Sequence, residues 1–191
     1  MSTDKNTKHS YFSHYEKMFN KFNKNDNLNI LEIGVQTGGG LLFLNKHFPN
    51  SDILGIDINF EPFDKKILKN ENIKIVEENG YDDNFIKKNF SNNNVFFDII
   101  IDDGPHTLES QIFSIDNYSK LLKEKGILVI EDVALYKREN KKGEFIKTLK
   151  LEKNLQDYIN NDIKNNFKIE LLDLTQERNR FDNALLILEK I

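Results

Sequence analysis

The sequence predicts an α/β fold: a mostly parallel seven-stranded sheet with helices on both faces and an antiparallel hairpin at its C-terminal edge. Three observations predict this fold. Strand-like and helix-like stretches alternate along the chain, which is typical of parallel sheets whose strands are joined by helices. The stretches Ile99–His106 and Ile127–Val133 are runs of β-branched and apolar residues that end abruptly in carboxylates, a pattern that places charge at the ligand-binding edge of a parallel sheet. The last two strand-like stretches have no helix-like stretch between them, which adds an antiparallel pair.

Seven strands are predicted from runs rich in aliphatic and β-branched residues. In chain order they are Asn29–Ile33, Asp52–Ile58, Ile73–Glu77, Phe96–Asp102, Gly126–Ile130, Phe167–Leu174 and Ala184–Glu189. The predicted helices between them are Gly40–His47, Asp83–Phe90, Leu108–Leu122 and a long polar helix over Gly143–Lys164. The charged stretch Lys137–Glu144, inside the segment 135–145, follows the fifth strand and is interpreted as a solvated loop or as a lid over the edge of the sheet.

The N-terminal residues carry a helical stripe of aromatic side chains that we expect to pack in the core. The stripe consists of Tyr11, Tyr15 and Phe19. We interpret residues 1–27 as an N-terminal helical segment that closes over the ligand with the help of Lys5 and His9, and residues 28–191 as one domain. A packing or surface position is nevertheless the first expectation for His9.

Composition limits the class of protein. A chain of 191 residues suits one α/β domain. The net charge of −4, with only three arginines, argues against a nucleic-acid groove. The absence of cysteine excludes disulfides and thiolate metal sites. No apolar run is long enough for a signal core or a membrane span, so we expect a cytoplasmic protein without a membrane partner. The sequence leaves homo-oligomerisation open.

The stretch Ile30–Gly40 combines a strand, a tight glycine turn and the start of a helix. Small residues such as Gly34 and Gly38 allow a ligand to approach the backbone closely. The glycine spacing is not that of a dinucleotide-binding loop. Glu32 at the end of the strand would repel a pyrophosphate, and we expect it to help bind a cationic amino-acid group of the cofactor, directly or through water. S-adenosylmethionine carries an ammonium and a sulfonium and no phosphate. It is therefore the predicted cofactor.

The second strand ends in Asp57, followed by Ile58. A carboxylate at this position accepts hydrogen bonds from ribose hydroxyls in nicotinamide enzymes and in S-adenosylmethionine enzymes alike. We therefore place both residues at the cofactor. Consecutive aspartates point in different directions, so Asp102 is expected to cap its loop or to contact the cofactor, while the next residue serves another role.

The carboxylates Asp103, Glu131 and Asp132 leave two neighbouring strands of the predicted sheet, with His106 just beyond the first of them. Crowded acidic groups repel one another unless a positive charge lies among them. Hard carboxylate oxygens without cysteine favour Mg²⁺, Mn²⁺ or Ca²⁺ over a structural Zn²⁺. Such an ion lowers the pKa of a bound hydroxyl, and a histidine that titrates near neutrality accepts the proton as a general base.

Several motifs together resemble one known family. They are TDK and YFSHYEKMF near the start, LEIGVQTGGG, LGIDI, IDDGPH and VIEDV. In these motifs the chain resembles the metal-dependent class I O-methyltransferases that modify sugar hydroxyls of macrolide antibiotics, the mycinamicin and macrocin type. The resemblance covers most of the chain, and Pro105 stands where the family usually has serine.

The resemblance implies a Rossmann-like methyltransferase fold, with S-adenosylmethionine and magnesium as cofactors. It implies the same metal ligands, Asp103, Glu131 and Asp132, and His106 as the base. It also implies that Asn79 takes the position on the adenine side where the family often has an aspartate.

We therefore predict a metal-assisted O-methyltransferase acting on a small hydroxylated acceptor, such as a sugar or a sugar-bearing metabolite. Two alternatives stay open: an N-methyltransferase on the same scaffold, and a non-catalytic protein that binds S-adenosylmethionine. An N-methyltransferase has less need of a metal and a base. A non-catalytic protein would keep the glycine loop and lose the acidic residues with the histidine. A nicotinamide-dependent enzyme is disfavoured by Glu32 and the glycine spacing.

Overall fold

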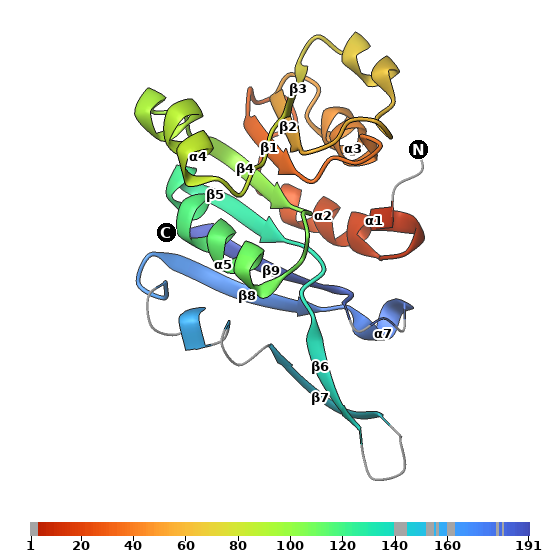
Figure 1. Ribbon diagram of the computed structural model, residues 1–191. Helices are drawn as coiled ribbons and strands as arrows, with labels where there is room; N and C mark the ends of the chain where they lie inside the picture. The colour runs from red at the N-terminus through yellow and green to blue at the C-terminus, as the bar shows by residue number, and fades with distance from the viewer. Residues whose placement is uncertain are drawn as a thin grey trace.

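A computed structural model of the protein describes residues 4–139, 145–151, 155, 157–159, 163–178, 180 and 182–191. Seven strands form one sheet in the order β3-β2-β1-β4-β5-β9-β8 (Figure 1). They are β1 (Asn29–Ile33), β2 (Asp52–Asp57), β3 (Ile73–Glu77), β4 (Phe97–Asp102), β5 (Leu122–Ile130), β8 (Phe167–Asp173) and β9 (Ala184–Lys190). Strands β1 to β5 pair in parallel, whereas β9 is antiparallel to both β5 and β8. The predicted α/β fold and its C-terminal hairpin are confirmed.

Helices cover both faces of the sheet. The α-helices are α1 (Asp4–Thr7), α2 (Tyr11–Phe19), α3 (Gly39–His47), α4 (Asp83–Asn89), α5 (Leu108–Asn117) and α7 (Thr175–Arg178), and the short 3₁₀ helices are η1 (Lys65–Lys69), η2 (Ser91–Asn93) and η3 (Ser119–Leu121). Helices α2 and α3 pack on one face with Ile99 of β4, and α4 and α5 pack on the other face with Ile100. Because successive residues of a strand point to opposite faces, a strand covered on both sides is apolar throughout.

The structure corrects the prediction between β5 and β8. The predicted polar helix over Gly143–Lys164 is wrong at its start, because β7 (Phe145–Leu151) pairs antiparallel with β6 (Leu135–Glu139). This two-stranded sheet extends away from the main body (Figure 1). The alternating pattern of Phe145–Leu151 suits a strand once a partner strand is present. Of the predicted helix, residues 155 and 157–159 are helical. Residues 140–144 of the predicted loop or lid lie outside the described residues.

Two smaller differences concern helix ends. The predicted helix Leu108–Leu122 ends at Asn117, and after one 3₁₀ turn β5 already begins at Leu122. The last two strands are separated by the single-turn helix α7, where no helix was predicted.

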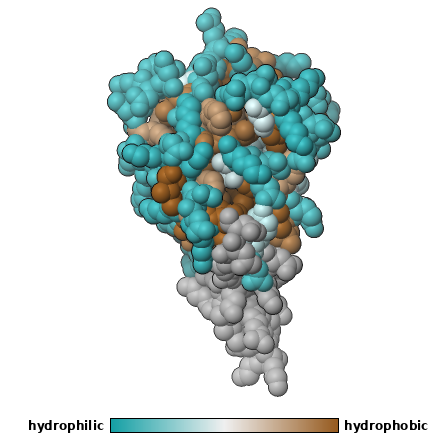
Figure 2. All heavy atoms as spheres, turned by 90° about the vertical axis from the view of Figure 1, so that its left-hand side faces the viewer, coloured by the Kyte–Doolittle hydropathy of each residue, from teal (hydrophilic) through white to brown (hydrophobic). Residues whose placement is uncertain are grey.

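None of the helices in the described ranges has the length and apolar character that crossing a bilayer requires. On the face shown in Figure 2, hydrophilic side chains cover most of the surface and hydrophobic residues show through in small groups.

Candidate active site at the carboxyl edge of the sheet

Backbone hydrogen bonds continue across the sheet just beyond its carboxyl edge. The amide of Asp103 donates to the carbonyl of Ile33 at 2.8 Å, and the amide of Glu131 donates to the carbonyl of Asp102 at 2.9 Å. These bonds hold the residues that follow β1, β4 and β5 side by side. The edge between β1 and β4 is also where the strand order reverses, the usual position of a ligand site in an open α/β sheet.

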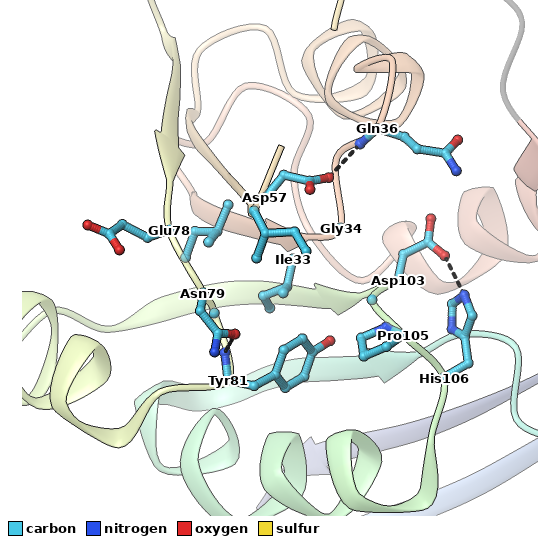
Figure 3. A pocket seen from close by; sticks show the side chains of 14 residues that line it. Ile33, Gly34, Gln36, Asp57, Glu78, Asn79, Tyr81, Asp103, Pro105 and His106 are labelled. Carbon is cyan, nitrogen blue, oxygen red and sulfur yellow. Dashed lines mark hydrogen bonds and ion pairs between the residues drawn. The ribbon is translucent and has the colours of Figure 1, made fainter. Parts of the chain in front are cut away.

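A cavity of about 350 Å³ lies at this edge (Figure 3). The loops after β1, β2, β3 and β4 line it with Ile33, Gly34, Gln36, Ile56, Asp57, Ile58, Glu78, Asn79, Gly80, Tyr81, Asp103, Gly104, Pro105 and His106. Four of the predicted cofactor residues are among them: Gly34, Asp57, Ile58 and Asn79. Its volume lies within the range of small-molecule sites.

The glycine turn after β1 depends on close backbone packing. Gly34 has φ +86°, and a Cβ atom there would lie 2.0 Å from the carbonyl oxygen of Asp103. Only glycine allows the loops after β1 and β4 to approach this closely. Gly38 also has φ +86°, but a Cβ atom there would meet Ile67 at 2.4 Å. Gly38 therefore supports the turn from behind and does not line the cavity.

Asp57 ties the end of β2 to the glycine turn. Its Oδ2 atom accepts hydrogen bonds from the backbone amides of Val35 and Gln36, both at 2.8 Å, and Oδ1 accepts from the amide of Asn59 at 3.1 Å (Figure 3). The carboxylate that was predicted to bind ribose therefore also shapes the loop beside it.

Asp102 lies behind the cavity wall. It is buried and accepts hydrogen bonds from the hydroxyls of Tyr81 and Ser114, the latter at 2.6 Å. Burial raises the pKa of Asp102, and the two hydroxyls act against that rise. Its contacts support Tyr81, which lines the cavity and which the sequence analysis did not single out. The only signal for Tyr81 was an aromatic residue shortly after the third predicted strand.

Three predicted residues meet beside the cavity, and we call them the outer triad: Asp103, His106 and Asp132. Asp103 and His106 line the cavity. His106 Nε2 lies 3.8 Å from Asp103 Oδ1 and 3.6 Å from Asp132 Oδ2. Each residue offers one possible ligand atom, and these three atoms all lie within 4.8 Å of one another. His106 and Asp132 have φ values of +57° and +52°, which residues other than glycine adopt rarely and which are enriched at functional sites.

Behind the outer triad lies a second group, which we call the inner cluster: Lys5, Glu32 and Glu131. The Lys5 ammonium lies 2.7 Å from Glu131 Oε1 and 3.3 Å from Glu32 Oε1, and it also contacts Asp103 Oδ2 at 2.5 Å. All three members are at most 3% exposed. Burial alone would lower the pKa of Lys5, but the surrounding carboxylates raise it well above its usual value. Part of the positive charge that we expected from a metal ion is therefore supplied by the chain itself.

The aromatic stripe of α2 reaches the same edge. Tyr11 and Tyr15 are fully buried, as predicted, and their hydroxyls donate hydrogen bonds to carboxylates of the site. Tyr15 donates to Glu131 Oε1 at 2.6 Å, and Tyr11 donates to Asp132 Oδ1 at 2.7 Å. The expectation for His9 was incomplete, because its Nε2 atom lies 3.4 Å from Asp132 Oδ2. For Tyr11 and Tyr15, the signal in the sequence was the tyrosine side chain itself, because a buried phenol needs a hydrogen-bond partner.

The donor set of the outer triad fits a hard divalent cation. Asp103 Oδ1 and Asp132 Oδ2 are carboxylate oxygens beside the cavity, and Mg²⁺ is commonly held by one or two carboxylates while it retains several waters. Glu131, the third predicted ligand, lies in the inner cluster and does not belong to the outer triad. Burial and Asp103 raise the pKa of Glu131, whereas Lys5 and Tyr15 act against that rise.

Comparison with solved structures identifies the fold. Over 95% of its length the chain superposes, with TM-score 0.69 and 22% identity, on half of the structure of the MycE methyltransferase from the mycinamycin pathway, which was solved with Mg, SAH and mycinamycin VI. The fold is that of the class I methyltransferases. The pre-rRNA processing protein fibrillarin of Methanococcus jannaschii shares it, with TM-score 0.55 and 16% identity over 88% of this chain and 69% of that chain. The fold alone therefore does not choose the acceptor.

Two curated relatives of the chain are named as O-methyltransferases. The mycinamicin VI 2''-O-methyltransferase of Micromonospora griseorubida and the demethylmacrocin O-methyltransferase of Streptomyces fradiae are each 30% identical to the chain over 132 residues, 65% of its length. The resemblance drawn from the motifs is confirmed. The matched region is 32% of each relative, so the chain spans about a third of the curated relatives that it matches. No family model matches the chain.

Proposed function

We propose that the protein is an S-adenosylmethionine-dependent O-methyltransferase that uses a divalent cation, Mg²⁺ or Mn²⁺. The observation that carries this proposal is the convergence of Asp103, His106 and Asp132, two of which line the same cavity as Gly34 of the glycine turn. The chemistry needs a cofactor pocket and a proton acceptor at one place. The two curated relatives support the proposal by their O-methyltransferase names.

The cavity suits the adenosine part of the cofactor. Asp57 lies at the β2 edge for the ribose hydroxyls, and Ile58 is an apolar side chain that is 71% exposed at the cavity, where it offers a surface for a base. Asn79 lies at the far end of the same wall. Glu32 lies in the inner cluster and Asp102 behind the wall, so both act on the cofactor through their neighbours. The cofactor supplies an electrophilic methyl group on a sulfonium.

The outer triad provides the acceptor side. Asp103 Oδ1 and Asp132 Oδ2 would hold the ion, which when bound acidifies a hydroxyl that it contacts. His106 is the general base, because its side chain is one-third exposed at the cavity and its Nε2 atom lies near both carboxylates. Methyl transfer further requires that the nucleophile, the methyl carbon and the sulfur lie in line. Cavity walls that are anchored to the ends of the strands favour this alignment. Glu131, the third predicted ligand, contacts Lys5 and Tyr15 in the inner cluster, and we propose that Asp103 and Asp132 hold the ion without it.

The proposed acceptor is a small hydroxylated molecule, a sugar or a sugar-bearing metabolite, and the proposed location is the cytoplasm. We propose that residues 1–27 form a segment that covers the site of the methyltransferase domain, residues 28–191. The pairing of a histidine with two carboxylates favours a hydroxyl over an amine, since an amine is nucleophilic without metal or base. A non-catalytic binding protein would have no use for that pairing.

Titration calorimetry tests the cofactor. We expect S-adenosylmethionine to bind with and without Mg²⁺ and NAD not to bind, because Glu32 and the glycine spacing leave no place for a pyrophosphate. Binding of NAD instead would direct the search to redox chemistry. Absence of binding for both would remove the methyltransferase proposal.

A further inference from the structure

The two carboxylates of the outer triad each have one oxygen held from behind by the N-terminal segment. Lys5 binds Asp103 Oδ2 at 2.5 Å, and Tyr11 donates to Asp132 Oδ1 at 2.7 Å. The remaining oxygens, Asp103 Oδ1 and Asp132 Oδ2, are the ones that lie 3.8 and 3.6 Å from His106 Nε2. Asp132 Oδ2 also lies 3.4 Å from His9 Nε2. Each carboxylate thereby has one oxygen held by the N-terminal segment and the other beside His106.

The hydroxyl donor of Tyr11 is held firmly in place. Tyr11 is fully buried, and its hydroxyl also lies 3.2 Å from the carbonyl oxygen of Asp182. The next residue, Phe12, stacks on Phe43 of α3 with ring centroids 4.0 Å apart and planes 7° apart. The phenol is therefore fixed relative to the sheet edge before any ligand binds.

We infer that Lys5 and Tyr11 are positioning residues for the metal centre, which turn one oxygen of Asp103 and one of Asp132 toward a divalent cation beside His106. This inference rests on the proposed function. Partners that orient metal ligands from behind change metal affinity by about 10- to 100-fold when they are removed. In this protein those partners come from residues that precede the methyltransferase domain.

Tyr15 offers a matched comparison on the same helix. It is as buried as Tyr11 and also donates a phenol hydrogen bond to a carboxylate, at 2.6 Å. Its acceptor is Glu131, which belongs to the inner cluster and is already held by Lys5. We therefore assign Tyr15 to the inner cluster and Tyr11 to the metal centre.

The test is a Mn²⁺ titration of the full chain followed by electron paramagnetic resonance, for the wild type, Tyr11→Phe and Tyr15→Phe. Each variant keeps its ring and loses one hydroxyl, and a circular dichroism spectrum checks that it is folded. We expect Tyr11→Phe to weaken Mn²⁺ binding by about tenfold, and Tyr15→Phe to weaken it less than about twofold because Glu131 lies outside the outer triad. A merely structural role would move both variants alike.

Unchanged Mn²⁺ affinity in Tyr11→Phe would overturn the inference, and so would equal losses in the two variants. Calorimetry with S-adenosylmethionine on the same samples separates this inference from the proposed function. A wild type that binds S-adenosylmethionine but no Mn²⁺ would remove the metal and this inference with it. Mn²⁺ binding with the expected difference, but no S-adenosylmethionine binding, would support the inference and overturn the proposed function.

Discussion

The inner cluster and the outer triad contain the same kind of side chain at the same edge of the sheet, yet they compensate its charge differently. In the inner cluster, Glu32 and Glu131 are 1% exposed and share the Lys5 ammonium. In the outer triad, Asp103 and Asp132 are 17% and 15% exposed and face a histidine that is 33% exposed. A buried carboxylate needs a fixed partner, whereas a partly exposed one can exchange partners. The comparison separates carboxylates that hold the structure from those available for chemistry.

The largest expected effect is on turnover and concerns the outer triad. We expect His106→Ala to lower turnover by about 10²- to 10⁴-fold, because a general base contributes that much to proton transfer. Binding of S-adenosylmethionine should be retained, since the glycine turn and Asp57 are untouched. A methyl-transfer assay with a hydroxylated sugar acceptor, combined with calorimetry, measures both. Near-normal turnover would remove His106 as the base.

The next effect concerns the inner cluster and is on stability. Lys5→Met leaves buried carboxylates without their cation, and we expect it to lower the free energy of unfolding by about 3–5 kcal/mol. Urea unfolding followed by circular dichroism measures this change.

Lys21→Met provides the control for that experiment. Lys21 pairs with Glu189 at 2.7 Å, but both side chains are about one-third exposed. The same substitution should therefore cost less than about 1 kcal/mol. Similar losses for the two lysines would contradict the distinction between a buried and an exposed cation.

The smallest effect concerns Asp102, a carboxylate of the edge that belongs to neither group. Ser114→Ala removes the hydroxyl that donates to Asp102 Oδ2 at 2.6 Å, and we expect a loss of about 1–3 kcal/mol in stability. Ser13, an exposed residue whose hydroxyl lies 3.4 Å from the carbonyl of Ser10, is the control, with an expected change within about 0.5 kcal/mol. A loss in Ser114→Ala no larger than that in Ser13→Ala would contradict the role of the Ser114 hydroxyl in holding the buried carboxylate.

Local patterns were sufficient for most of the sheet. β1 and β3 have the predicted bounds, and the predicted β2 is one residue too long, because apolar runs bounded by glycine, asparagine or charge carry that information within a few residues. The segment Phe145–Leu151 was assigned to a helix, because its strand character depends on pairing with Leu135–Glu139. A strand of a two-stranded sheet gains its ladder hydrogen bonds only from its single partner strand, so the residues of the segment taken alone do not reveal it.

By itself the sequence determined the α/β fold, the glycine turn and the residues of the acidic edge, since strand ends and the order of strands place them together. Only the tertiary structure decided how those acids divide between two sides. Lys5 meets Asp103 across 98 positions and Glu131 across 126, and no local pattern encodes such contacts. The left-handed backbone of His106 and Asp132 is likewise set by the surrounding packing. Burial enclosed Glu32 and Glu131 around Lys5. It left Asp103 and Asp132 partly exposed beside His106, with one oxygen of each held by Lys5 or Tyr11.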